Sequence, residues 1–177
     1  MNINQLMRKE KRVTRKVFFS FHYIPDCWRA SQVRNIGTIE GNQAISDNDW
    51  EEVTKGGDQA IKDWIAGQLS GKSCAVVLIG SNTAGRKWIT HEISEAWNAK
   101  KGVVGIYVHN LQDANQKQCT KGGNPFTSVT MNRDQAKMST IVKAYDPPYS
   151  VSTDVYKYIS DNIEAFVEEA ITIRNNY

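Results

Sequence analysis

The chain has 177 residues, 40 % of them hydrophobic, which is enough for the core of one domain. Its net charge of +3 comes from residues 1–16, which carry six Lys or Arg against one Glu, whereas the remaining 161 residues carry 16 basic and 18 acidic groups. The slight excess of acidic groups in residues 17–177 argues against nucleic acid as the main ligand, because proteins that bind duplexes carry a basic surface on the folded domain. We expect a flexible basic arm over residues 1–15 and one domain over residues 16–177.

The first third of the chain predicts a strand, a helix, a loop and a second helix. Val17–Tyr23 (VFFSFHY) is aromatic and apolar, as in a buried strand. Residues 26–36 predict a short helix, and residues 37–49, rich in Gly, Asn and Asp, predict a loop. The next helix is expected to be capped by Asp58 and to end before Gly71.

The middle of the chain contains two continuous apolar runs, Cys74–Ile79 and Val103–Val108. Continuous runs are typical of strands buried on both faces of a parallel sheet. Between them, a polar turn leads into a helix over about residues 88–100, and after them residues 110–137 form a long polar segment of a kind that is often functional.

The C-terminal part predicts a last strand at Thr140–Tyr145 and a closing helix capped by Ser152 or Thr153. Strands that alternate with helices predict an α/β fold with a parallel sheet. In such sheets ligands bind beyond the carboxyl ends of the strands, so the loops after Tyr23, Ile79 and Val108 are the places to search.

Several sites common in α/β proteins are absent. The loop after the first strand has neither GxGxxG nor GxxxxGK[ST], which excludes the usual dinucleotide and nucleotide cradles. The three cysteines (Cys27, Cys74 and Cys119) form no CxxC pair, so we expect no metal site and no disulfide framework. We see no signal peptide and no apolar run of membrane-spanning length, and expect a cytoplasmic protein without membrane contacts.

Glu92 is the most informative residue of the helix near residues 88–100. On a helical wheel of about 100° per residue it falls inside the apolar arc, between Trp88 and Ala96. A carboxylate in a core-facing stripe is costly unless its charge is used, although Glu92 could also reach water or pair with an arginine. His91 falls on the opposite side and is expected to face solvent.

A single carboxylate at this edge of a sheet suits the cleavage of an N-glycosidic bond. Such cleavage passes through an oxocarbenium-like state, whose positive charge a carboxylate beside the ribose can stabilise. Glycosidases usually need a second carboxylic acid to protonate the leaving group. Nicotinamide leaves NAD as a neutral molecule, so for that substrate one glutamate would suffice.

The order of VFFSFHY, the DxDW stretch at Asp47–Trp50, VLIGSNT, W-x-x-x-E at Trp88–Glu92 and KGGNPF at Lys121–Phe126 resembles the TIR domain family. The likeness is closest to the TIR-like subunit of the bacterial Thoeris anti-phage system and covers about residues 16–127. It implies a flavodoxin-like, five-stranded parallel sheet flanked by helices, and an enzyme that consumes NAD as substrate without a metal.

The resemblance implies that Glu92 is the catalytic residue. The other residues expected to bind the substrate are Phe19, Ser20, Phe21, His22, Asp49, Trp50, Ser81 and Trp88. Many TIR domains have Arg where this chain has His22, and Ser where it has Lys87. The expected product is a cyclic ADP-ribose isomer or a related ADP-ribose conjugate, and residues 37–50 and 110–137 are long enough to form a lid that would favour cyclisation.

In Thoeris the TIR-like protein makes a diffusible nucleotide signal after infection, and that signal activates a partner effector. Self-association between TIR domains is a further implied contact. Two alternatives stay open: a TIR adaptor that performs no chemistry, and an N-glycosidase that acts on another nucleotide or nucleoside.

Overall fold

The computed structural model describes residues 14–42 and 47–177, without the side chains of residues 47–49. Most of the predicted basic arm and the side chain of Asp49 therefore lie outside the described residues. Within this part of the chain, four parallel strands form one sheet in the order β1-β2-β3-β4. Their bounds are β1 (Val17–Ser20), β2 (Cys74–Ile79), β3 (Gly102–Tyr107) and β4 (Ala144–Tyr145).

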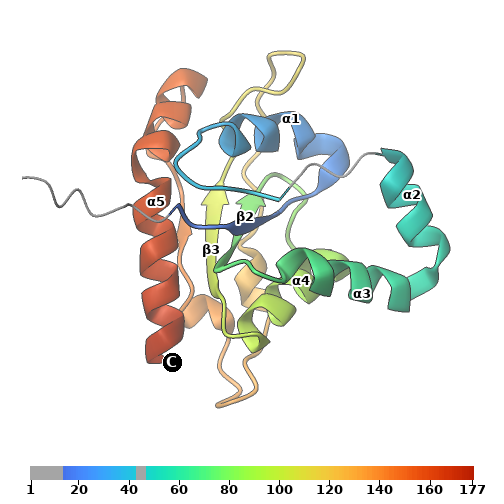
Figure 1. Ribbon diagram of the computed structural model, residues 1–177. Coiled ribbons are helices and arrows are strands. Elements are labelled where there is room, and N and C mark those ends of the chain that lie inside the picture. The colour runs from blue at the N-terminus through green and yellow to red at the C-terminus, as the bar shows by residue number, and fades with distance from the viewer. Residues whose placement is uncertain (1–13, 43–46) are drawn as a thin grey trace, which may run out of the picture.

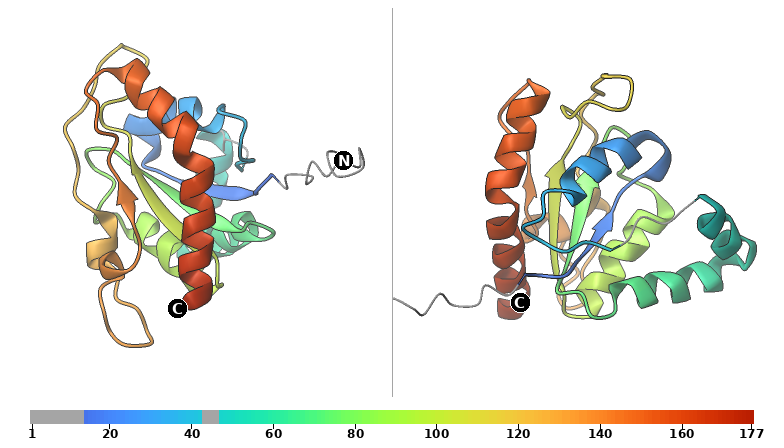
Figure 2. Two further views of the ribbon diagram at one scale, coloured as in Figure 1. Left: turned by 90° about the vertical axis from the view of Figure 1, so that its left-hand side faces the viewer. Right: turned by 45° about the horizontal axis from the view of Figure 1, so that its top comes forward.

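Helices cover both faces of the sheet (Figure 1). On one face, α1 (Tyr23–Arg34) and α5 (Ser152–Asn176) bury apolar residues against the strands. On the other, α3 (Gly57–Leu69) and α4 (Lys87–Asn98) do the same. Figure 2 shows α2 (Asp47–Lys55) at the end of an arm that α3 extends away from the sheet.

The expected fifth strand is reduced to one pair of residues, so the prediction of five strands was wrong. Glu40 forms a parallel bridge with Lys16, and the amide of Val17 donates to the carbonyl of Glu40 at 2.8 Å. This segment lies beside β1, where a flavodoxin-like sheet places its second strand. Gly37 and Gly41 flank the bridge, and glycine weakens a strand because it loses much backbone entropy and packs no side chain.

Several element boundaries differ from the predictions, and α1, β3 and β4 are each shifted or shortened by up to four residues. β1 ends at Ser20 and not at the predicted Tyr23. The chain turns into α1, which begins at Tyr23 after His22 as its N-cap. The predicted loop over residues 37–49 gives way to α2 at Asp47. The predicted side-chain caps are also wrong, since α3 and α5 begin after Gly56 and Val151.

Arg29, which forms a buried ion pair within α1, also ties this helix to the long segment after β3. Arg29 is 2 % exposed and contacts Asp26 Oδ1 at 3.1 Å. The same guanidinium donates to the carbonyls of Pro25, Leu111 and Lys117, each at 2.9 Å. With these bonds, Arg29 fixes part of the 110–137 segment on α1.

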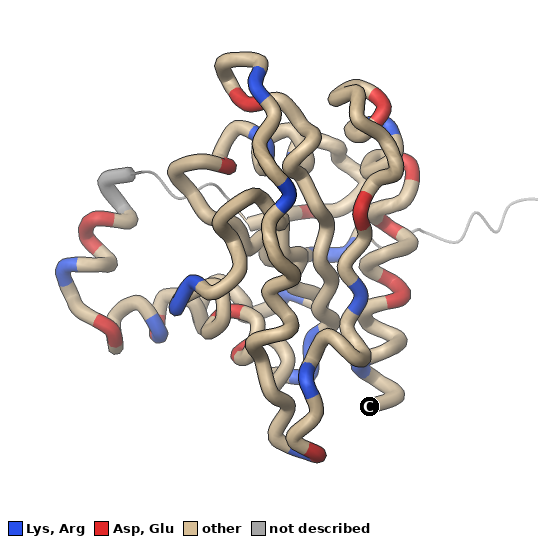
Figure 3. Tube along the Cα trace, turned by 180° about the vertical axis from the view of Figure 1, so that it is seen from behind, with Lys and Arg blue, Asp and Glu red and all other residues tan. Residues whose placement is uncertain are grey.

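The surface carries charges of both signs, with no single-sign face in the view of Figure 3. Arg15, at the last position of the predicted arm, forms an ion pair with Glu168 of α5 at 2.6 Å. No helix of the described residues has both the length and the apolar character needed to cross a bilayer.

Candidate functional site

A pocket of about 730 Å³ opens at the carboxyl end of β1, between the start of α4 and the arm made by α2 and α3. Within the described part of the chain, β1 has β2 on one side and only the Glu40 bridge on the other, so the pocket lies where the order of the chain reverses. The lining residues are Phe18, Phe19, Phe21, His22, Tyr23, Ile24, Arg34, Asn42, Trp50, Glu51, Trp64, Gly85, Arg86, Lys87, Trp88, Ile89 and Glu92.

Glu92 reaches this pocket from the second turn of α4. Gly85, at a φ of 79°, turns the chain, and Arg86 precedes the helix in an extended conformation. Ile89 and Ile93 bury the core-facing side of α4, and Glu92 projects into the pocket beside them. The placement expected from the helical wheel is therefore confirmed.

The carboxylate of Glu92 has a neutral partner. Ser20 of β1 is 1 % exposed, and its hydroxyl donates a hydrogen bond to Oε2 of Glu92. Burial raises the pKa of Glu92 to about 7, and the bond from Ser20 opposes this rise. Neither a bond nor an ion pair links Glu92 to an arginine or lysine of the described residues, so no positive charge there opposes the rise of its pKa on burial.

Trp88 lies one helical turn before Glu92, and its ring contacts the side chains of Lys87 and His91. The ammonium group of Lys87 lies 4.6 Å from the centre of its ring, and Lys87 in turn pairs with Asp58 of α3. The imidazole of His91 packs edge-on against Trp88 at 5.8 Å, and its Nε2 is buried. His91 is half-buried beside Trp88, so the prediction that it faces solvent is met only in part.

The far wall of the pocket is aromatic. Trp50 of α2 and Trp64 of α3 meet edge to face, with ring centres 5.8 Å apart. Nearer to β1, the rings of Phe21 and Tyr23 lie 6.2 Å apart at an angle of 29°. Aromatic walls with a few polar groups are typical of pockets that bind small organic ligands.

His22 lies at the mouth of the pocket, at the N-cap of α1. Burial lowers the pKa of its imidazole, and the positive charge of Arg86 lowers it further. Its Nδ1 is buried and has no hydrogen-bond partner among the described residues. At neutral pH the ring is uncharged and can accept or donate one hydrogen bond.

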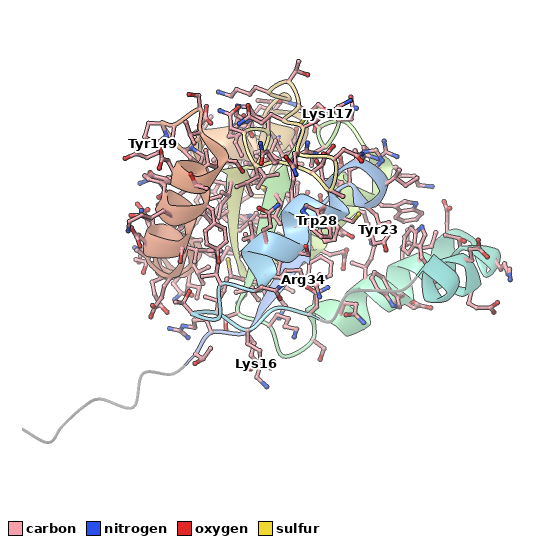
Figure 4. The ribbon with its side chains drawn as sticks, turned by 90° about the horizontal axis from the view of Figure 1, so that it is seen from above. Lys16, Tyr23, Trp28, Arg34, Lys117 and Tyr149 are labelled. Carbon is pink, nitrogen blue, oxygen red and sulfur yellow. The ribbon has the colours of Figure 1, made fainter. Side chains whose placement is uncertain are left out.

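Arg34 and Asn42 extend the pocket along the outer edge of β1, and the sequence reasoning missed both. The guanidinium of Arg34 donates to the carbonyl of Asn42, whose side-chain oxygen accepts from the amide of Phe19 at 2.9 Å. Figure 4 shows Arg34 at the end of α1, beside the loop that follows it. Arg34 belongs to no motif, so no signal in the sequence points to it.

The structure brings most of the expected residues together. Ser20 lies behind Glu92 and contacts it, while Ser81 does not line the pocket. The backbone of Ser81 instead meets Gly122, where any side chain would collide with it. No residue of 110–137 lines the pocket, so of the two expected lid segments only 37–50 contributes. The expected residues found in the lining are Phe19, Phe21, His22, Trp50, Trp88 and Glu92.

A parallel sheet whose first strand ends at a pocket lined by a half-buried glutamate of α4 is the arrangement expected of TIR-like domains. The comparison with known families agrees: residues 18–113, more than half of the chain, match the family described as "Thoeris protein ThsB, TIR-like domain". The chain belongs to this family.

One relative is a protein of Bacillus cereus (strain MSX-D12) named "Putative cyclic ADP-D-ribose synthase ThsB1". It is 35 % identical over 120 residues, which cover 64 % of this chain and 62 % of the relative. The chain thus aligns with less than two thirds of that protein's length.

Proposed function

We propose that this protein cleaves the bond between nicotinamide and ribose in NAD and joins the released ADP-ribose into a cyclic isomer. The observation that carries this proposal is Glu92, a carboxylate with no cationic partner among the described residues, placed in an aromatic pocket. The name of the Bacillus relative supports the cyclic product.

Glu92 would act by charge. When the bond from ribose C1′ to the nicotinamide nitrogen breaks, its electron pair neutralises the pyridinium and leaves positive charge on the ribose. A carboxylate in a low-dielectric pocket stabilises that charge strongly. The Ser20 hydroxyl is the positioning group, because it holds Oε2 of Glu92 and favours its ionised form.

The acceptor decides the product. A ribose hydroxyl or an adenine nitrogen of the same ADP-ribose closes a ring at C1′, and an attacking hydroxyl gives up its proton to solvent. Water instead gives free ADP-ribose and likewise releases a proton. Trp50 and Trp64 could hold the adenine within reach of C1′ and exclude water from the bond that breaks. The cyclic product would then leave the pocket and activate a separate effector.

The test is to incubate the wild type and Glu92→Gln with NAD and to analyse the products by mass spectrometry. We expect Glu92→Gln to lose at least about 100-fold in kcat/KM, since removing one preorganised electrostatic group typically costs 10²–10³-fold. Glu95→Gln, on the same helix but outside the pocket lining, is the control and should keep its activity. Equal turnover by wild type and Glu92→Gln would refute the role of Glu92.

The assay should be repeated in extracts of phage-infected and uninfected cells, because the resemblance implies activation by infection. Competition by nucleosides separates NAD cleavage from the alternative N-glycosidase. Strong inhibition by nucleosides, together with release of a base other than nicotinamide, would favour that alternative.

One observation favours a second candidate function, that of an adaptor which binds other TIR domains and performs no chemistry. On α1, Ile24 is 85 % exposed and Trp28 is 53 % exposed, one helical turn apart. Exposed apolar side chains grouped in this way can mark a contact surface. An adaptor would show self-association that Trp28→Glu abolishes, and no NAD turnover in infected extracts.

A further inference from the structure

Arg34 differs from the other cations of the pocket in its surroundings. Its side chain is part-buried, and burial lowers its pKa. Among the described residues its guanidinium is bonded to a single group, the main-chain carbonyl of Asn42, and no carboxylate lies within ion-pair distance. A desolvated cation without a counter-charge is costly, so its presence in a pocket needs an explanation.

The positive charges of the two neighbouring cations, Lys87 and Arg86, are accounted for by their surroundings. Lys87 pairs with Asp58 and also covers the ring of Trp88. Arg86 is exposed to water at the start of α4. Arg34 is therefore the cation of the described lining that is both part-buried and without an anionic partner.

The backbone of β1 places Arg34 and Glu92 on opposite sides of one short segment. The amide of Phe19 bonds the side chain of Asn42, whose carbonyl holds Arg34. The next residue, Ser20, directs its hydroxyl to Glu92. Two adjacent residues thus position a cation at the outer edge of β1 and a carboxylate on the α4 side, with the pocket in contact with both.

We propose that Arg34 binds a phosphoryl group of the substrate and so makes the pocket selective for phosphate-bearing nucleotides over neutral nucleosides. Guanidinium offers parallel N–H donors that match two phosphoryl oxygens, and such charged bonds are stronger in a low-dielectric site. The carbonyl of Asn42 uses one terminal nitrogen of Arg34, which leaves other donors for a ligand. This inference rests on the proposed function for the identity of the nucleotide that binds. The assignment of Arg34 as a binding group for an anion does not depend on it.

The binding test uses ADP-ribose, which carries two phosphates, and adenosine, which carries none. Both are titrated calorimetrically into the full chain carrying Glu92→Gln, with and without Arg34→Gln. We expect Arg34→Gln to weaken ADP-ribose binding about 10- to 100-fold, the usual effect of losing a hydrogen bond to a charged group. Adenosine affinity should change by less than about twofold.

Arg174→Gln is the matched control. Arg174 is also part-buried and donates to one main-chain carbonyl, that of Trp97 at 2.9 Å, but it lies outside the pocket lining. It should leave both affinities unchanged. If Arg34→Gln does not fold, as judged by circular dichroism, Arg34→Lys replaces it; this variant keeps the charge, loses the paired donors, and should lose several-fold in ADP-ribose affinity.

The outcomes separate this inference from the proposed function. A selective loss of ADP-ribose binding supports the role of Arg34 even if the wild type turns over no NAD. Wild-type turnover of NAD with an unchanged KM in the Arg34 variant would overturn the inference and leave the proposed function standing. Failure of the parent chain to bind ADP-ribose, or an equal loss for both probes, would also overturn it.

Discussion

The two arginines of α1 have opposite environments, although they lie only five positions apart. Arg29 pairs with Asp26 and donates to three main-chain carbonyls. Arg34, in the pocket, bonds one carbonyl. The first arginine holds two segments together through its protein partners, whereas the second has, among the described residues, donors that no protein group uses.

The two buried carboxylates show the same contrast. Asp26 is fully buried and has Arg29 as its counter-charge, although burial still raises its pKa. Among the described residues, Glu92 has only the hydroxyl of Ser20 as a hydrogen-bond partner. In the part of the chain that the structure describes, the buried charge pair of α1 holds segments of the fold together, whereas Glu92 and Arg34, which have only neutral partners there, lie at the pocket.

The largest effect is expected from breaking the architectural pair. Arg29→Met leaves Asp26 uncompensated and removes the bonds to the 110–137 segment, so it should lower the free energy of unfolding by about 3–5 kcal/mol. Denaturant unfolding measures this loss. Lys55→Met removes an ion pair of the same i,i+3 spacing whose side chains are 67 % and 74 % exposed, and should cost under about 1 kcal/mol. Equal losses of unfolding free energy in Arg29→Met and Lys55→Met would contradict the structural role assigned to the buried pair.

A smaller effect of opposite sign is expected at Glu92. Its pKa is higher in the folded state, so the folded chain binds more protons than the unfolded chain between pH 4.5 and about 7, and stability falls as pH rises through this window. Glu92→Gln removes the charge and should stabilise the fold by on the order of 2–3 kcal/mol at pH 8. The gain should disappear near pH 4.5, and unfolding curves at both pH values test it. A destabilised variant at pH 8 would contradict the assignment.

The smallest effect concerns Ser20. Ionised Glu92 is the active form under the proposed function, so kcat/KM should rise with pH through about 7. Ser20→Ala removes a bond that lowers the pKa of Glu92, and should move this rise to higher pH by under about one unit. Turnover would fall a few-fold at pH 7 and recover near pH 9. Ser94→Ala, whose hydroxyl bonds the carbonyl of Thr90 on the same helix, should leave the profile unchanged.

The parallel sheet and the position of Glu92 were predictable from the sequence. Cys74–Ile79 was predicted with the bounds that the structure has, because an apolar run buried on both faces leaves little ambiguity. Glu92 followed from the 3.6-residue period of α4. Both inferences need only local patterns.

Other features depend on contacts that no local pattern records. α2 begins in an Asn- and Asp-rich stretch, and Trp50 packs it against Trp64 of α3. Ser81 follows a strand as expected, but Gly122 covers its backbone and it does not line the pocket. Arg34 reaches the pocket only because the loop after α1 returns along β1.

The reduced edge of the sheet has a consequence for association between chains. An exposed edge strand invites pairing with strands of other molecules, and proteins protect such edges in several ways. Here the outward amides of β1 are already bonded: Val17 to the carbonyl of Glu40, and Phe19 to the side chain of Asn42. One bridge and one amide side chain thus satisfy, within the described residues, the two outward amides through which another strand would pair, and so protect this edge from aggregation.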